Sequence, residues 1–313
     1  MQAPILVDSG AHAAAGPRTI QDSYVCGTSD VPLRYETIGR ALDRTAATHS
    51  NREALVVVHQ GIRWTWSELL REVDALAAGF VALGLEVGDR VGIWSPNCVE
   101  WVLTQLATAK AGLMLVTINP AYRTSELEHA LNLSGCRALV LAERFKTSDY
   151  VGMLLELAPE LKSSNSGPVR SERLPQLDLV VQIGRPALSS FLAFDDLSGR
   201  ATPEALAELT ERTNRLQPDD PINIQFTSGT TGAPKGATLT HHNILNNGFF
   251  VGELMRFTHE DRLCIPVPLY HCFGMVMGVM NCVTHGSTMV FPSDAFEPGA
   301  VLEAVQGERC TAL

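Results

Sequence analysis

The sequence lacks several features that would place it in a broad class at once. It contains no run of about twenty apolar residues, which is the length that a membrane-spanning helix needs. It has no basic stripe, because its lysines and arginines are scattered through a chain of formal net charge −10. Neither an internal repeat nor a low-complexity tract is visible. We therefore expect neither a transmembrane segment nor a nucleic-acid partner.

The sequence also lacks the cysteine and histidine spacings that are typical of metal sites and redox-active disulfides. The seven cysteines include no Cys-x-x-Cys pair, and the nine histidines show no metal-binding spacing, so we predict no metal site. Most of the cysteines lie in apolar runs, which favours buried, reduced thiols and a reducing compartment. The first twenty residues lack a positive region followed by a long apolar core, so we expect no secretory signal and a cytoplasmic protein.

What is present is the composition and periodicity of a globular α/β protein. The 313 residues are 45% hydrophobic and 19% charged, which is enough to bury a large core. After about residue 33, amphipathic helical segments alternate with short apolar strands, which predicts parallel sheets flanked by helices. Thr65 and Glu68 form the Thr-x-x-Glu pattern of a helix capping box. Residues 1–30, rich in Ala, Gly, Ser and Pro, are predicted to form a loose arm.

The segment 222–236 carries the strongest chemical signal. Apolar and polar residues alternate over 222–226, which predicts a half-buried strand, and small and hydroxylated residues follow. Glycines let backbone N–H groups converge on an anion, while hydroxyl groups and Lys235 add donors and a positive charge. The pattern predicts a cradle for a polyphosphate, although it is neither a Walker A loop nor a Gly-x-Gly-x-x-Gly turn. A surface loop of turn residues is the alternative.

This segment resembles the phosphate-binding signature of the adenylate-forming (AMP-binding) superfamily. The resembling run is Thr227-Ser-Gly-Thr-Thr-Gly-Ala-Pro-Lys235-Gly236. Three further blocks resemble neighbouring motifs of the superfamily: Leu239-Thr-His241-His-Asn243, Pro268-Leu-Tyr-His271-Cys-Phe-Gly274, and Ile118-Asn-Pro120-Ala-Tyr with Glu126-Leu-Glu-His-Ala-Leu131. The likeness covers nearly the whole chain after about residue 30 and leans toward medium- and long-chain fatty-acyl-CoA synthetases.

The resemblance implies a fold, a reaction and a set of site residues. The fold would be the large N-terminal domain of these enzymes, incomplete over residues 31–313 and without the small C-terminal domain. The reaction would join a fatty acid to coenzyme A through an acyl-adenylate made from ATP with Mg²⁺. His271 would lie beside the acyl carboxylate, with a core histidine as the alternative. The residues implied to bind the ATP phosphates are Thr227, Ser228, Gly229, Thr230, Thr231, Gly232, Ala233, Pro234 and Lys235.

The resemblance also implies segments that these residues do not include. The adenine segment, the ribose-binding aspartate, the contacts with coenzyme A and the catalytic lysine are expected beyond residue 313, so no catalytic residue is assigned. We therefore expect an N-terminal fragment with little or no ligase activity by itself. Two alternatives stay open: a non-catalytic module that binds nucleotide or a partner, and an amino-acid-activating domain. Acyl chain length and oligomeric state are not specified by the sequence.

Two local expectations concern the segment after His271. Residues 271–284 are predicted to form one helix, whose methionines would line an acyl tunnel or, as is more usual, pack in the core. A nucleophilic pair of Cys272 with His271 is not expected, because side chains adjacent in sequence rarely have the geometry to pair.

Overall fold

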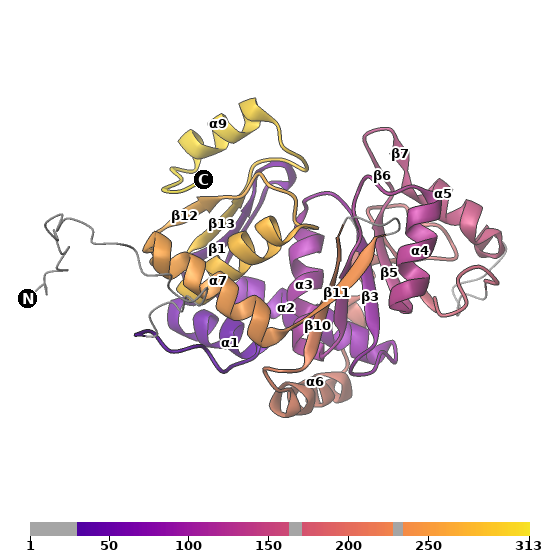
Figure 1. Ribbon diagram of the computed structural model, residues 1–313, viewed down its shortest axis with the longest axis horizontal. Coiled ribbons are helices and arrows are strands. Elements are labelled where there is room, and N and C mark those ends of the chain that lie inside the picture. The colour runs from indigo at the N-terminus through magenta and orange to yellow at the C-terminus, as the bar shows by residue number, and fades with distance from the viewer. Residues whose placement is uncertain (1–29, 163–170, 228–233) are drawn as a thin grey trace, which may run out of the picture. The chain divides into compact units, whose positions relative to one another are not determined.

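The computed structural model describes residues 30–162, 171–227 and 234–313 (Figure 1). The chain divides after Leu33 into two units, 1–33 and 34–313, and the helices and strands of the described residues lie in the second. Of the residues implied to bind phosphate, 228–233 lie outside the described residues, as does most of the predicted arm.

Strands and helices alternate along the second unit, as the sequence predicts. The strands are β1 (Glu53–Val57), β2 (Ile62–Thr65), β3 (Arg90–Trp94), β4 (Met114–Thr117), β5 (Cys136–Ala142), β6 (Arg144–Phe145), β7 (Ser148–Asp149), β8 (Leu179–Ile183), β9 (Leu192–Ala193), β10 (Pro221–Thr227), β11 (Lys235–Thr240), β12 (Arg262–Cys264) and β13 (Thr288–Phe291). The helices are α1 (Ile38–His49), α2 (Trp66–Ala82), α3 (Val99–Ala111), α4 (Thr124–Ser134), α5 (Tyr150–Leu157), α6 (Pro203–Arg215), α7 (His241–Met255), the π-helical segment η5 (Phe273–Met280), α8 (Asn281–His285) and α9 (Pro298–Gly307).

Two sheets organise these elements. The larger has the strand order β11-β10-β4-β3-β5-β8-β9, and the smaller has the order β12-β13-β1-β2. Neighbouring strands are parallel except in the pairs β10–β11 and β1–β2, whose connections are short. The smaller sheet joins distant parts of the chain, because Leu55 of β1 pairs with Met289 of β13. The predicted α/β fold with parallel sheets flanked by helices is confirmed.

Alternating side chains along the strands divide the core into layers. Leu55 and Val57 face the same hydrophobic core as α1, α2 and α3, whereas Val56 faces α9. In the larger sheet, Val140 faces the shared core, and Leu139 faces α4 and α5 on the opposite side. The helices α1, α2 and α3 therefore lie between the two sheets, with α9 and the α4–α5 pair on the outer faces (Figure 1).

The predicted capping box is present at the start of α2. Thr65 Oγ1 accepts the Glu68 N–H at 3.3 Å, and Glu68 Oε2 accepts the Thr65 N–H at 2.8 Å. These two bonds satisfy backbone donors that the first turn of a helix leaves without partners. The boundary of this helix was thus readable from four residues of sequence.

The prediction of a single helix over 271–284 is wrong. The structure has the π-helical segment η5 over Phe273–Met280, and α8 begins at Asn281. The segment is apolar throughout, so its sequence periodicity cannot distinguish the wider π turn from the α turn. The backbone at Gly274 comes so close to Pro268 that an added Cβ would lie 2.5 Å from the Pro268 carbonyl oxygen.

Two other features differ from the sequence-based expectation. A two-stranded hairpin, β6–β7, follows β5 and leads into α5, where the sequence shows no clear pattern. The last residues, 310–313, are predicted to begin a strand, but Ala312 alone forms a bridge there, with Leu263 of β12. Burial of the cysteines follows the prediction for Cys98, Cys136, Cys264 and Cys282, and Cys272 is exposed.

Candidate functional site

The hairpin β10–β11 presents the connection that the sequence assigns to phosphate binding. β10 lies beside β4, and the buried Asn223 Nδ2 donates to the Leu115 carbonyl at 3.0 Å. On its other side β10 pairs with β11, and the pairing extends to Thr227 opposite Lys235. The connection therefore leaves the sheet at the carboxyl end of β10. This is the edge of a parallel sheet at which ligands bind in α/β folds.

Lys235 and Thr227 stand at the base of this connection. Both residues are exposed, and Lys235 forms no ion pair with any residue that the structure describes. Its ammonium group is therefore available to an anion from solution. The imidazole of His129, on α4, contacts the carbonyl of Pro234 from outside the hairpin at 3.1 Å. The phosphate-binding role of 227–235 stays a prediction.

His271 lies in the connection between β12 and η5 and is exposed. Its Nδ1 accepts the Phe273 N–H at 3.1 Å, which places a neutral imidazole proton on Nε2. An Nε2–H group of this kind can donate to a carboxylate oxygen. Cys272 Sγ lies 3.6 Å from the same Nδ1, so the two side chains are in contact, and the expectation that they do not act as a nucleophilic pair stays a prediction. The Phe273 N–H already uses the lone pair that would take the thiol proton.

The hairpin and the His271 segment are in contact. The amide nitrogen of Gln225, in β10, lies 2.7 Å from Met275 Sδ in η5. Met275 and Met280 are buried in the core, whereas Met277 is 38% exposed. The phosphate-binding motif and His271, 36 residues farther along the chain by numbering, thus belong to one region of the molecule.

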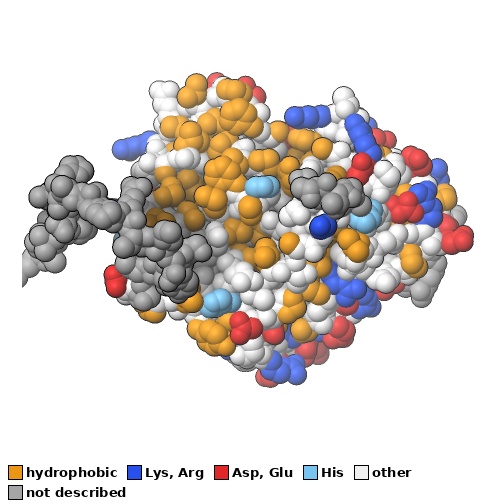
Figure 2. Space-filling view, in the orientation of Figure 1, with side chains coloured by type: hydrophobic (Ala, Val, Ile, Leu, Met, Phe, Trp, Pro, Cys, Tyr) orange, Lys and Arg blue, Asp and Glu red, His pale blue; other side chains and the backbone are white. Residues whose placement is uncertain are grey.

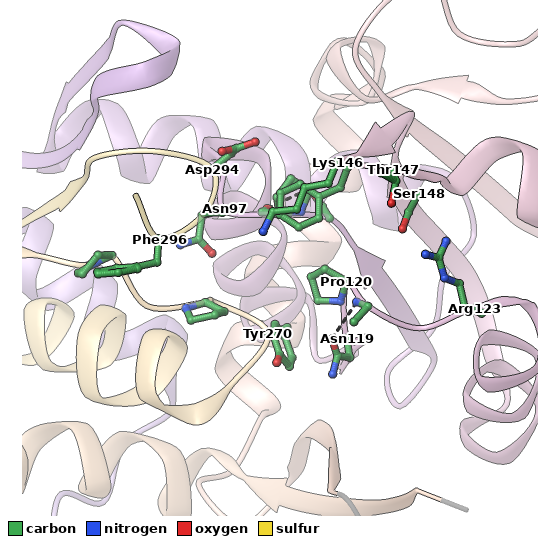
Figure 3. A pocket seen from close by; sticks show the side chains of 17 residues that line it. Asn97, Asn119, Pro120, Arg123, Lys146, Thr147, Ser148, Tyr270, Asp294 and Phe296 are labelled. Atoms are coloured by element: carbon green, nitrogen blue, oxygen red, sulfur yellow. Dashed lines mark hydrogen bonds between the residues drawn. The ribbon is translucent and has the colours of Figure 1, made fainter. Parts of the chain in front are cut away.

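A cavity of about 420 Å³ opens at this edge, where connections from both sheets meet (Figure 3). The larger sheet has its switch point here, because the chain leaves β3 for β4 on one side and then returns to β5 on the other. Such a switch point is where doubly wound sheets form a crevice for ligands. The connections that line the cavity are 95–97, 119–121, 145–148, residues 266, 268 and 270, and 294–296.

The lining of this cavity combines cations with aromatic rings. Arg123 and Lys146 line it, and neither forms an ion pair with another described residue. The Lys146 Nζ lies 5.2 Å from the centre of the Phe145 ring, and Phe296 is 64% exposed at the opposite side. Figure 3 shows Lys146, Asn97 and Asp294 around the same opening. Such a lining can hold a molecule that carries an anionic group and a flat or apolar part.

Buried polar side chains fix the connections around the cavity. Asn97 is 3% exposed, and its amide donates to the Val267 carbonyl at 2.9 Å and accepts the Leu269 N–H at 2.8 Å. The Tyr150 hydroxyl donates to the Pro120 carbonyl at 2.8 Å, and burial raises the pKa of this hydroxyl. These contacts hold the cavity wall in place. Asn97, Arg123 and Lys146 were missed from sequence, since no motif with a known role marks them.

An apolar cavity of about 320 Å³ adjoins the first one and shares Pro266 and Phe296 with it. Phe273 and Met277 of η5 line it together with residues of α7 and β12. Figure 2 shows hydrophobic side chains gathered on this face between α7 and α9. His271 lies in the chain between Tyr270, which lines the polar cavity, and Phe273, which lines the apolar one. An apolar chain that ends in a polar group fits this arrangement.

Comparison with known proteins decides the family. The model of the AMP-binding enzyme family matches residues 42–313. The chain belongs to this family. The resemblance read from the motifs around residues 227–236 is thereby confirmed.

Relatives of this AMP-binding family member are similar over most of its length. The mitochondrial medium-chain acyl-CoA ligase ACSF2 of Danio rerio is 45% identical over 295 residues, which cover 94% of this chain and 48% of the relative. The human ACSF2 is 44% identical over 296 residues, 93% of this chain and 48% of the relative. The chain therefore spans about half the length of these curated relatives.

A solved structure shows the same fold. The crystal structure of a long-chain-fatty-acid-CoA ligase from Archaeoglobus fulgidus has a TM-score of 0.72 at 22% identity, over 93% of this chain and 54% of that one. Among the described residues, no helix has the length and apolar character to cross a membrane. No group of three or more His, Cys, Asp or Glu in the described part of the chain could hold a metal ion.

Proposed function

We propose that this chain is the phosphate-binding part of an adenylate-forming ligase that joins a fatty acid to coenzyme A. The observation that carries the proposal is the placement of Lys235, which is exposed and forms no ion pair with a described residue, on a hairpin that contacts the His271 segment through Gln225 and Met275. Similarity to the medium-chain acyl-CoA ligase ACSF2 supports a fatty-acyl substrate over an amino acid. Fatty acid, ATP and coenzyme A are the proposed substrates, and Mg²⁺ enters with the ATP phosphates.

The reaction requires two group transfers, first of the adenylyl group to the fatty acid and then of the acyl group to coenzyme A. In the first, a carboxylate oxygen attacks the α-phosphorus of ATP, and the bond to the bridging oxygen breaks to release pyrophosphate. Lys235 and the backbone and hydroxyl donors of 227–235 stabilise the charge that gathers on the leaving pyrophosphate. His271 Nε2–H donates to the carboxylate and orients it. In the second, the coenzyme A thiol attacks the acyl carbon, and AMP leaves.

The two cavities suit the two other substrates. The apolar cavity beside His271 matches the chemistry of a saturated acyl chain. The polar cavity, with Arg123, Lys146 and the exposed ring of Phe296, matches coenzyme A, a nucleotide that carries several phosphates. Lys146 has a positive φ of 52° at the hairpin turn, a conformation uncommon for a side chain of this size.

Titration calorimetry of the chain with Mg-ATP tests the proposal. Because the chain spans about half the length of its curated relatives, binding is measured instead of turnover. Lys235→Ala should weaken the affinity by roughly tenfold to 150-fold, because a charge-assisted contact contributes roughly 1.5–3 kcal/mol. Arg200→Ala is the matched control, since Arg200 is an exposed cation that no ion pair engages among the described residues.

Each result separates the alternatives. Equal affinity of the chain and Lys235→Ala would remove Lys235 from its role, and no binding by the unmodified chain would refute the nucleotide site. Acid-dependent exchange of pyrophosphate into ATP distinguishes a ligase from a module that only binds nucleotide, and we expect little exchange from this chain alone. A cytoplasmic location is part of the proposal, although the ACSF2 relatives are mitochondrial proteins.

A further inference from the structure

Helix α4 is held in place by its own caps and by a core cluster on the outer face of the larger sheet, a cluster that also includes Ile224 of β10. At its start, the Arg123 N–H donates to Glu126 Oε2 at 3.1 Å, and Gly135 ends the helix with a positive φ of 64°. Leu127 and Leu131 pack in the core on the outer face of the larger sheet. These contacts fix the position of α4 relative to β4 and β5.

His129 projects from this fixed helix to the base of the phosphate-binding connection. Its Nε2 lies 3.1 Å from the carbonyl oxygen of Pro234, a residue 105 positions away in the sequence. A carbonyl oxygen only accepts, so His129 must carry a proton on Nε2 and donate it. The side chain is half-buried, which shields the bond from part of the competing water.

The hydrogen bond from His129 holds the backbone at Pro234, directly before Lys235. A proline has no N–H, so its carbonyl is the one backbone group through which this residue can be held. The next residue is Lys235, where the pairing of β11 with β10 begins. Pairing within the hairpin fixes Lys235 from the β10 side, and His129 fixes the residue before it from α4. The direction in which Lys235 leaves the strand therefore depends on both.

We propose that His129 is a positioning residue for the nucleotide, which holds the carboxyl end of the phosphate-binding connection so that Lys235 and its neighbouring donors meet the phosphates. The inference rests on the proposed function, because it gives His129 a role in binding the same ligand. His129 does not touch the nucleotide in this proposal, and it acts through the Pro234 carbonyl. The motif that contains it, 126–131, is otherwise accounted for by the apolar face of α4.

Three variants test the proposal in titrations with Mg-ATP. His129→Leu removes the donor and keeps an apolar side chain of comparable size, so the affinity should fall about threefold to tenfold, the range that one hydrogen bond contributes. His129→Gln keeps an N–H donor at similar reach and should bind within about twofold of the unmodified chain. Asn132→Leu is the matched control on the same helix, because it removes a 2.9 Å bond from Asn132 to the Arg173 carbonyl, away from the hairpin.

Two measurements on the chain without nucleotide test whether His129 holds the hairpin through its Nε2–H group. Nitrogen-15 NMR of the imidazole should show the proton on Nε2, and amide exchange along β11 should be faster in His129→Leu than in His129→Gln or Asn132→Leu. A proton on Nδ1 with Nε2 bare, or unchanged exchange along β11, would overturn the contact itself.

The titrations separate failure of this inference from failure of the proposed function. If the unmodified chain binds Mg-ATP and His129→Leu binds it within about twofold, the positioning role is refuted while the phosphate site stands. If His129→Leu weakens binding and His129→Gln does not restore it, the donor is not what matters, and the proposal is again refuted. Absence of binding by the unmodified chain refutes the proposed function and the positioning role together.

Discussion

A buried histidine should make this protein less stable as the solution becomes acidic. His241 is the first residue of α7 and is fully buried. Its Nδ1 accepts the Ile38 N–H at 3.2 Å, and its Nε2 has no hydrogen-bond partner among the described residues. Burial lowers the pKa of His241 from its ordinary 6.5 to about 4, and the Asp220 carboxylate only partly opposes this effect. A proton added to Nδ1 would also break the bond to Ile38.

The sign and size of the effect follow from this lowered pKa. Between pH 6.5 and pH 4 the unfolded chain binds a proton at His241 that the folded chain does not, so the free energy of unfolding falls as the pH falls. Above pH 6.5 both states are neutral at this residue, and the stabilisation is fully present. Each pKa unit corresponds to about 1.4 kcal/mol, so the loss at pH 4.5 amounts to roughly 2–3 kcal/mol.

Urea unfolding at pH 7 and pH 4.5 measures this loss. His241→Asn offers an oxygen to the Ile38 N–H and does not titrate, so its free energy of unfolding should fall by roughly 2–3 kcal/mol less than that of the unmodified chain over the same interval. His242→Asn, at the adjacent position, should keep the full fall because His241 is still present. An identical fall in the unmodified chain and His241→Asn would refute the reasoning.

Two further predictions concern packing and charge in the core. Gly79→Ala should destabilise the fold by about 1–3 kcal/mol in urea unfolding, because the new Cβ would lie 2.3 Å from the Leu197 carbonyl oxygen. Gly199→Ala, where an added Cβ meets nothing within 4 Å, should change stability by less than about 0.5 kcal/mol. Lys110→Met should lower the free energy of unfolding by about 3 kcal/mol in the same assay. The buried Lys110 ammonium lies 2.5 Å from the Asp74 carboxylate, which would lose its cation. An unchanged unfolding midpoint would contradict this prediction.

The elements of the fold were predictable because their signals are local. Alternation of apolar residues at period two marks a strand, and the pair Thr65 and Glu68 marks a helix start, whatever the rest of the chain does. The pairing of β1 with β13 has no local signal, since it joins residues more than two hundred positions apart by numbering. The π-helical turns of η5 were missed because the segment is apolar throughout, so no periodicity in its sequence marks the wider turn.

The candidate site likewise has one part that could be predicted from sequence and one that could not. Its hairpin could be read from one run of residues, because glycine, hydroxyl groups and lysine occur together there. The cavity could not, because its wall is assembled from five connections that each contribute a few residues. Lys146 illustrates the difficulty, since its position depends on the turn of the hairpin β6–β7, and no motif accompanies it. His129 was visible within a resembling block, but its contact with Pro234 requires the fold.

Electrostatics explain how a chain of net charge −10 can offer a site to phosphates. Coulomb interactions between exposed charges are screened beyond about 8 Å at physiological ionic strength, so an incoming anion responds to the nearest charges more than to the total. Away from the site, arginines such as Arg137 are engaged by carboxylates, in this case Asp89 and Asp178. Arg123, Lys146 and Lys235 form no ion pair among the described residues. Arg123 and Lys146 lie in connections at the carboxyl edge of the larger sheet, and Lys235 lies at the base of the connection between β10 and β11. Local positive charge at that edge therefore does not require a basic protein.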